Sequence, residues 1–102
     1  MLENVDLSKK MKKKDYDIIK EEYELKLGSL QREAKKLGIP IIILFEGWGA
    51  SGKGTLINKF IHPLDPRGFN VYSTKVSNSE EKYYPFLHRF WTKTPAKGDM
   101  VI

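Results

Sequence analysis

Cysteine is absent from the 102 residues of the sequence, which excludes disulfide bonds and thiolate metal sites. A long hydrophobic run is also missing, because no stretch approaches the ~20 apolar residues that a membrane-spanning helix requires. The N-terminal segment "MLENVDLSKKMKKK" carries charges where a secretory signal has its apolar region. We therefore expect a cytoplasmic protein without a membrane partner.

Acidic residues are fewer than basic ones. The sequence has 13 Asp and Glu residues and 18 Lys and Arg residues, and the net charge is +5. Such an excess suits an anionic partner, for which a nucleotide, polyphosphate, a nucleic acid and an acidic membrane surface are candidates. Much of it lies in "KKMKKK" at residues 9–14, and we expect residues 1–14 to form a basic, partly disordered segment. Because this run is terminal and the aromatic residues cluster elsewhere, a nucleic-acid partner is disfavoured.

Apolar residues recur at steps of three and four through residues 15–37, which predicts one long amphipathic helix. Its apolar stripe consists of Tyr16, Ile19, Tyr23, Leu27, Leu30, Ala34 and Leu37. Gly38 supplies a C-terminal cap and Pro40 prevents continuation, so the helix is expected to end at Leu37. Gly28 inside the helix costs about 1 kcal/mol relative to alanine, which does not overturn the prediction.

A consecutive apolar run, "IPIIILFE", occupies residues 39–46 and predicts a strand covered on both faces, as in a parallel sheet flanked by helices. A second helix is expected at residues 54–62, ended by Pro63. Its apolar residues at helical spacing are Leu56, Ile57, Phe60 and Ile61. After a turn at "DPRG", residues 65–68, the alternating segment "FNVYSTKV" predicts a second strand.

Ser77 and Glu80 have the spacing of a capping box, which predicts the start of a further helix with a kink or restart at Pro85. "TPAKGD" is typical of a loop, and "MVI" of the opening of a third strand. Strands joined by helical crossovers predict an α/β fold with a parallel sheet in three α/β/α layers. We expect residues 15–102 to be the N-terminal half of such a domain, and its exposed apolar surface to favour a homo-oligomer.

The first predicted strand leads into "GWGASGKGT", which has the spacing of a phosphate-binding loop, the Walker A motif: Gly47, four residues, then Gly52 and Lys53. Glycines let backbone N–H groups approach phosphate oxygens, and the following helix adds its N-terminal partial positive charge. Lys53 is expected to reach the terminal phosphates. A merely glycine-rich turn is the alternative, and the flanking strand and helix argue against it. The candidate phosphate-binding residues are Gly47, Trp48, Gly49, Ala50, Ser51, Gly52, Lys53, Gly54 and Thr55.

The hydroxyl of Thr55 is the candidate group for ordering a magnesium ion. It is displaced by one position from the usual site directly after the lysine, because Gly54 intervenes. Phosphate-loop proteins include kinases, GTPases and motor ATPases, and "GKGT" favours the kinases that act on small substrates.

Several separated motifs in residues 15–102 resemble, in the same order, those of the polyphosphate kinase 2 family. They are "FEG", the loop ending in "GKG", the "PRG" turn, "FLHRFW", and the "PAKG" loop before the third strand. The resemblance implies a phosphate-loop fold and a phosphotransferase that uses Mg2+ to move a phosphoryl group between inorganic polyphosphate and a nucleotide, AMP or ADP. It also implies that Lys53, Arg67 and Arg89 are catalytic candidates that contact phosphate. The alternatives are that Arg67 only ties down its turn, and that Arg89 is an exposed helix residue or pairs with Glu80 or Glu81.

Two departures from the family pattern limit this inference. The family usually has an aspartate two residues after the first loop glycine, where this sequence has Gly49. The family's "FDRSWY" motif and its arginine-bearing lid would follow Ile102. Since phosphoryl transfer depends on positioning and electrostatic stabilisation, we expect residues 1–102 alone to be nearly inactive.

Two other functions stay open. A nucleoside monophosphate kinase would use ATP as donor, although such kinases typically have their loop close to the N-terminus. A non-catalytic phosphate-binding or assembly unit of a two-domain protein would pair through the 15–37 helix and bind anions without turnover. Gly49 favours this last interpretation, whereas Lys53 and Thr55 argue against it.

Overall fold

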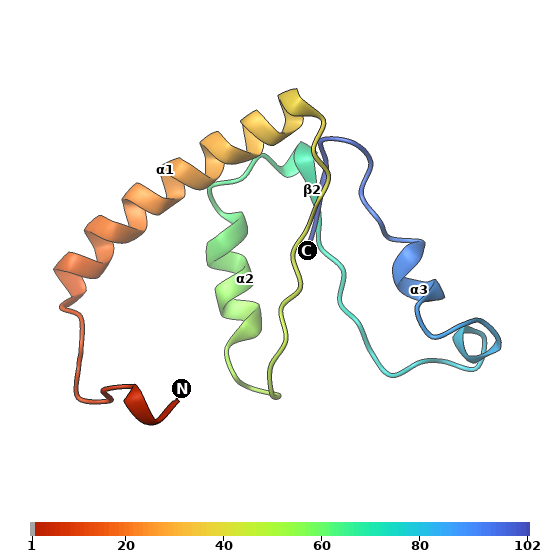
Figure 1. The fold of residues 1–102 in the computed structure, drawn as a ribbon, viewed down its shortest axis with the longest axis horizontal. Coiled ribbons are helices and arrows are strands. Elements are labelled where there is room, and N and C mark those ends of the chain that lie inside the picture. Colours follow the sequence, from red (N-terminus) through yellow and green to blue (C-terminus); the bar gives the residue numbers. More distant parts are fainter. Residues whose placement is uncertain (1) are drawn as a thin grey trace.

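The computed structural model describes residues 2–102 and shows a small α/β fold (Figure 1). Within these residues helices and strands alternate as α1 (Lys13–Leu37), β1 (Ile41–Ile42), α2 (Lys53–Ile61), β2 (Phe69–Asn70), α3 (His88–Trp91) and β3 (Met100–Val101). Three short 3-10 helices are η1 (Leu2–Asn4), η2 (Pro66–Gly68) and η3 (Glu81–Tyr83). No helix of this described part combines the length and the apolar character that crossing a membrane requires.

The three strands form a parallel sheet in the order β1-β3-β2, which confirms the predicted parallel arrangement. Met100 pairs with Ile41 on one side and with Phe69 on the other. β1 and β2 are shorter than the predicted strands at residues 39–46 and 69–76. A strand exists only beside a hydrogen-bonded neighbour, and β3 offers two residues to each of its neighbours.

The two faces of the sheet differ. One face carries the core, a buried cluster of Leu64, Met100 and Ile102. Partly buried side chains of the strands, α1 and α2 surround it: Leu27, Ile41, Ile43, Phe45, Ile57, Phe60, Ile61 and Phe69. On the other face Ile42 is 63% exposed and Leu44 is 73% exposed, so the prediction of a strand covered on both faces is wrong for this part of the chain.

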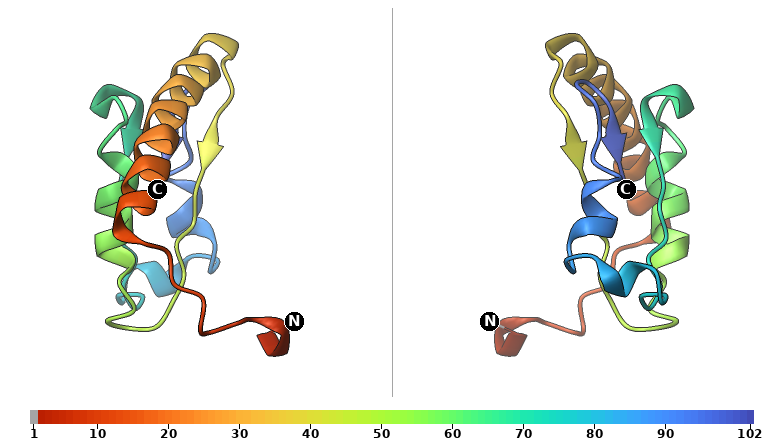
Figure 2. Two further views of the ribbon diagram at one scale, coloured as in Figure 1. Left: turned by 90° about the vertical axis from the view of Figure 1, so that its left-hand side faces the viewer. Right: turned by 90° about the vertical axis from the view of Figure 1, so that its right-hand side faces the viewer.

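Ile42 and Leu44 stay exposed because the helix on their side of the sheet, α3, is short. When the molecule is viewed from opposite sides, α1 lies in front of the strands in one view and α3 in the other (Figure 2). α3 has four residues, and a cavity of about 210 Å³ lined by Phe90, Trp91 and Ile42 lies between it and the sheet. So short a helix cannot cover the apolar side chains opposite.

α1 ends at the predicted residue and begins two residues before the predicted start at residue 15. Gly38 adopts the left-handed conformation with φ 67°, and the helix ends at Leu37. The helix starts at Lys13, so part of the basic run is helical. Among the described residues of α1 only Gly28 and Gln31 are buried. A Cβ atom at Gly28 would lie 3.2 Å from the carbonyl oxygen of Pro63, so glycine allows α1 to approach the end of α2.

The predicted helix at residue 77 does not form as a single element. The capping interaction is shifted by one residue: the Glu81 N–H donates to Asn78 Oδ1 (2.7 Å), and the Asn78 N–H donates to Glu81 Oε2 (3.0 Å). Only the short η3 follows, and the chain becomes helical again at α3. Pro85 between them lacks a backbone N–H for the hydrogen-bond ladder, which explains the restart.

Candidate functional site

The loop after β1 and the segment after β2 leave the same edge of the sheet, because the carboxyl ends of parallel strands meet at one edge. The loop, residues 47–52, turns the chain from β1 into α2 at the lower end of that helix in Figure 1. Residues 71–76 run from β2 toward η3 on the same side. The "DPRG" turn precedes β2 and therefore lies at the opposite edge.

The loop is shaped by two residues with positive φ. Gly52, the N-terminal cap of α2, has φ 90°, and Ala50 has φ 59°. At Gly47 the constraint is space, because a Cβ atom there would lie 2.9 Å from Ser51 Oγ. Residues 50–55 line a hollow of about 360 Å³ at the start of α2. The loop thus has the concave backbone and the helix N-terminus that phosphate binding requires.

Lys53, the first residue of α2, folds back over the loop. Its ammonium group donates to the carbonyl oxygen of Gly47 (2.5 Å) and to that of Trp48 (2.6 Å). The carbonyls of Gly47 and Trp48 thus hold the lysine over the loop. A phosphate group that enters the hollow offers stronger, charge-assisted acceptors in their place.

Oxygen ligands for a metal ion are few near the loop. Thr55 is exposed on the first turn of α2 and lines the same hollow. Among residues 2–102 no group of three or more His, Cys, Asp or Glu side chains is arranged to hold a metal ion. Mg2+ at phosphate-transfer sites is usually bound through one or two carboxylates together with substrate phosphates, and residues 47–55 supply the Thr55 hydroxyl but no carboxylate.

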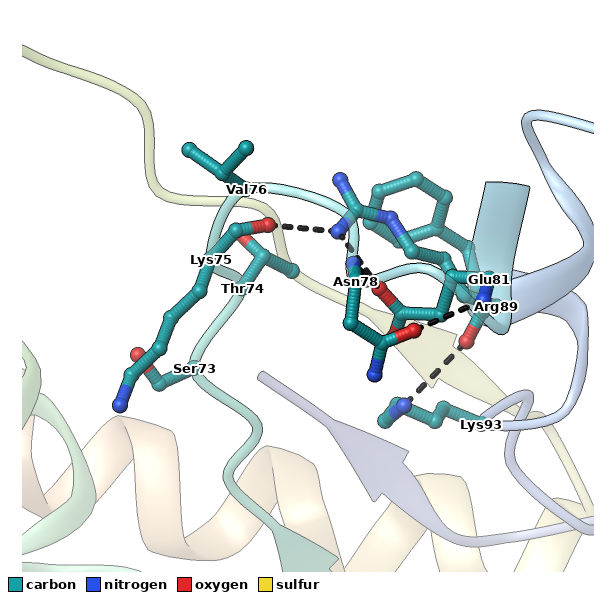
Figure 3. A pocket seen from close by; sticks show the side chains of 9 residues that line it. Ser73, Thr74, Lys75, Val76, Asn78, Glu81, Arg89 and Lys93 are labelled. Atoms are coloured by element: carbon teal, nitrogen blue, oxygen red, sulfur yellow. Dashed lines mark hydrogen bonds and ion pairs between the residues drawn. The ribbon is translucent and has the colours of Figure 1, made fainter.

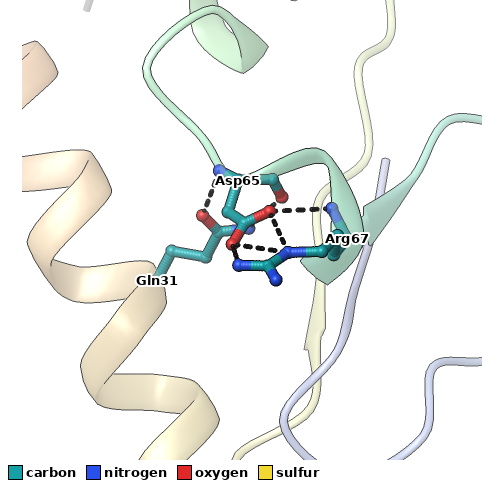
Figure 4. Close-up of polar contacts among 3 residues, drawn as sticks. All are labelled: Gln31, Asp65 and Arg67. Atoms are coloured by element: carbon teal, nitrogen blue, oxygen red, sulfur yellow. Dashed lines mark hydrogen bonds and ion pairs between the residues drawn. The ribbon is translucent and has the colours of Figure 1, made fainter.

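The structure does not bring Arg67 to the loop. Arg67 lies in η2, at the opposite edge of the sheet, where its guanidinium donates to Asp65 Oδ2 (2.8 Å) and is 84% exposed (Figure 4). The Asp65 carboxylate also caps η2 by accepting from the Arg67 N–H (3.0 Å). The hydrogen bond from the Arg67 side chain lowers the pKa of Asp65 from 3.8 to about 2. In the described residues Arg67 therefore stabilises a turn.

The same turn is anchored to α1 through Gln31. The Asp65 N–H donates to Gln31 Oε1 (2.7 Å), and Gln31 Nε2 donates to the Asp65 carbonyl oxygen (3.0 Å). Gln31 is only 6% exposed, so this paired contact is shielded from water. A Cβ atom at Gly68 would lie 2.7 Å from Gln31 Nε2, which explains the glycine in "DPRG".

Arg89 lies on the same side as the loop. Its Nη1 donates to the carbonyl oxygen of Lys75 (2.5 Å) in the segment after β2, and Glu81 Oε2 lies 3.6 Å away (Figure 3). Its guanidinium is centred 4.7 Å from the ring of Phe90. The side chain is 17% exposed, and its Nε is buried without a hydrogen-bond partner among the described residues.

The comparisons with known proteins decide the family. The model of the polyphosphate kinase 2 family matches residues 10–102. The chain belongs to this family. It is similar to a polyphosphate:AMP phosphotransferase of Pseudomonas syringae pv. tomato, with 34% identity over the whole chain and 20% of that protein. It also resembles a GDP-polyphosphate phosphotransferase of Pseudomonas aeruginosa, with 30% identity over 90% of the chain and 26% of that protein.

The solved structures agree with this assignment. The crystal structure of a putative polyphosphate kinase 2 from Pseudomonas aeruginosa superposes with a TM-score of 0.85 and 31% sequence identity, over 100% of this chain and 22% of that one. The α/β fold with a parallel sheet is thus shared with a structure of this family. Since the chain spans about a fifth to a third of the curated relatives it matches, their activities concern longer proteins.

The sequence did not identify some residues that lie at the edge of the sheet where the phosphate-binding loop is. Ser73, Thr74, Lys75 and Lys93 line a cavity beside Arg89. The sequence carried no signal for Ser73, Thr74 and Lys75, because they fall inside the strand predicted for residues 69–76, whereas the observed β2 ends at Asn70. Lys93 carried no signal either, since its place depends on how α3 folds back toward β2.

Proposed function

We propose that the protein serves phosphoryl transfer between inorganic polyphosphate and a nucleotide, AMP or ADP, in a three-layer phosphate-loop fold of the Walker A class. The observation that carries the proposal is the Lys53 ammonium, held over a hollow at the N-terminus of α2. The names of the relatives support polyphosphate as a substrate, since a polyphosphate:AMP and a GDP-polyphosphate phosphotransferase are among them.

In this proposal the backbone N–H groups of residues 50–55 and Lys53 bind the phosphates of the donor. Lys53 exchanges the Gly47 and Trp48 carbonyls for phosphate oxygens, and so places its charge where negative charge develops. Mg2+ would enter with the phosphates and be ordered by the Thr55 hydroxyl, supplying further neutralisation of charge. Arg89 is the second candidate for contact with phosphate, because it lies on the loop side.

The matched test uses Lys53→Ala and Lys59→Ala, which are the same substitution at the start and near the end of α2. Transfer is measured on the whole protein with magnesium, with long-chain polyphosphate or ATP as donor and AMP or ADP as acceptor. We expect transfer from polyphosphate, reduced about 100-fold or more by Lys53→Ala and unchanged by Lys59→Ala. Residues 1–102 alone are expected to be nearly inactive.

The other outcomes separate the alternatives. Transfer from ATP alone would point to a nucleoside monophosphate kinase. Transfer that is insensitive to Lys53→Ala would place the reaction outside this loop and overturn the proposal.

A non-catalytic, assembling unit is the second candidate, and two observations favour it. Gly49 leaves no carboxylate in the loop, while α1 exposes apolar side chains such as Tyr23 (59%) and Leu30 (64%). Exposed apolar stripes of this kind favour association with another subunit, and we propose a homo-oligomer that buries this face. Anion binding without turnover by the whole protein would support this candidate.

A further inference from the structure

A groove between α1 and α2 is open to solvent and lined by apolar side chains. α1 approaches the end of α2 at Gly28, and the two helices diverge toward the start of α1 (Figure 1). A cavity of about 360 Å³ lies between the diverging parts. Its apolar lining includes Tyr16, Ile19, Tyr23 and Leu27 of α1, and Leu56 and Phe60 of α2.

The lining side chains are only partly covered by the described residues. Tyr16 is 44% exposed and Leu56 is 55% exposed, on opposite walls of the groove. Contiguous apolar surface of this kind marks a binding surface, because its burial by a partner is favourable. The groove is concave and bordered by two helices, so a third helix that lays an apolar face into it would cover it.

The charge around the groove is positive. Met11 also lines the groove, and it lies within the lysine run at residues 9–14. Residues 9–20 contain six lysines and two aspartates. Within residues 2–102 no ion pair involves a lysine of the run. Inside the groove Lys20 is paired with Glu24 (3.5 Å), so the lining carries no free carboxylate.

The lysine run does not stabilise α1. Lys13 and Lys14 lie in the first turn of the helix and Lys12 precedes it. The positive end of the helix dipole disfavours cations at this place, and neighbouring like charges repel each other. Both effects are reduced when a negatively charged partner binds beside the lysines.

Other occupants fit the groove less well. Polyphosphate has no apolar surface to fill it, and a bilayer presents a flat surface to a concave one. A second copy in a two-fold interface would bring the same lysines against each other. The homo-oligomer proposed above can instead use Leu30 and Leu37, which are exposed on α1 and do not line the groove.

From the shape and the charge of the groove we propose that it is the docking site for an acidic amphipathic helix of a partner protein. Apolar residues at steps of three and four in the partner helix would cover Ile19, Tyr23 and Leu56. Its carboxylates would lie beside the lysine run. The site is separate from the phosphate-binding loop, because no residue of 47–55 lines the groove.

The test compares two neighbouring isoleucines of α1. Ile19 lines the groove and Ile18 does not, although both are exposed. Ile19→Glu and Ile18→Glu therefore add the same charge to the same helix on different faces, and circular dichroism verifies that both variants are folded. The probe is a labelled synthetic peptide of about five helical turns, with leucines along one face and glutamates elsewhere.

Binding of the peptide to the whole protein is measured by fluorescence anisotropy. We expect Ile19→Glu to weaken binding about tenfold and Ile18→Glu to change it less than about twofold. A peptide of the same composition, scrambled so that its leucines do not share a face, should not bind. The triple variant Lys12→Gln/Lys13→Gln/Lys14→Gln should weaken binding several-fold and reduce its dependence on salt.

The proposal is overturned if the amphipathic peptide does not bind, or if the two isoleucine variants weaken its binding equally. Two further measurements identify the occupant in that case. Binding of phosphatidylglycerol vesicles that is lost in Ile19→Glu alone would assign the groove to a lipid surface. Dissociation of an oligomer into monomers in Ile19→Glu alone would assign it to a second copy.

Discussion

Lys53 donates from its ammonium group to the carbonyl oxygen of Gly47 at 2.5 Å, so the proposed phosphate-binding lysine is hydrogen-bonded to its own loop. The same ammonium also bonds to the Trp48 carbonyl oxygen, and the Trp48 side chain is 89% exposed. The ammonium has three N–H donors and these bonds use two of them, so an anion in the hollow competes with the two carbonyls for the lysine.

Binding of an anion to the loop should therefore be detectable through the neighbouring Trp48 side chain. In residues 1–102 carrying Trp91→Phe, where Trp48 is the single indole, we expect the fluorescence of Trp48 to change on addition of tripolyphosphate. Lys53→Met should abolish the change. A response that persists in Lys53→Met would show that the lysine does not couple the loop to the anion.

Gly49 is predicted to tolerate a side chain. A Cβ atom at this position meets no atom within 4 Å, and its φ is not among the positive values of the loop. Gly49→Asp should change the free energy of unfolding by less than about 0.5 kcal/mol. If the missing carboxylate limits turnover, the same variant should raise the rate of transfer in the whole protein.

Gly52 supplies the contrast to Gly49. Its φ of 90° lies in the left-handed region, so Gly52→Ala should cost about 1–2 kcal/mol even though the space around it is open. Chemical denaturation of both variants measures the difference. Equal stability losses at the two positions would contradict the loop conformation described above.

Gly68→Ala is expected to destabilise the fold by about 1–3 kcal/mol, because the added methyl group meets the buried Gln31 amide. Gln31 cannot move away without leaving the backbone of Asp65 unpaired. The double variant Gly68→Ala/Gln31→Ala should lose less stability than the two single variants together, since the clash disappears with the amide. Strict additivity in urea denaturation would argue against the contact.

The contribution of the Asp65–Arg67 pair to stability is expected to depend on pH. The folded-state pKa of Asp65 is lowered to about 2 from 3.8, so the ionised carboxylate stabilises the turn above pH 3.8 and this contribution is lost as the pH falls toward 2. NMR titration of the Asp65 carboxyl carbon should show its pKa rising toward 3.8 in Arg67→Gln. The rise should be incomplete, because the backbone N–H of residue 67 still donates. A pKa that stays near 2 in Arg67→Gln, or one that rises equally in the control Lys97→Gln, would refute the pairing.

The local features of this fold were readable from the sequence. Gly38 and Pro40 predicted where α1 ends, and Gly47 to Lys53 predicted a loop between a strand and a helix. These signals are short-range: they depend on the conformations that glycine and proline allow. The family followed from the order of several such motifs and is confirmed by the family model.

Long-range placement was harder to predict. The resemblance implied that Arg67 contacts phosphate, with stabilisation of its turn as the alternative, and its position before β2 in a parallel sheet puts it at the edge opposite the loop. The choice between Ser77–Glu80 and Asn78–Glu81 as the capping pair could not be made from spacing, because both pairs have the same separation. In the structure Glu81 also faces Arg89, a contact from a later part of the chain that favours the second pair.

The order β1-β3-β2 has a consequence for how the protein is made. β1 and β2 do not touch each other through hydrogen bonds; each pairs with β3, which the ribosome synthesises after both. During translation β1 and β2 stay without a common neighbour until Met100–Val101, which follows both in the sequence, inserts between them. The joining of β1 and β2 into one sheet therefore depends on the two residues of β3.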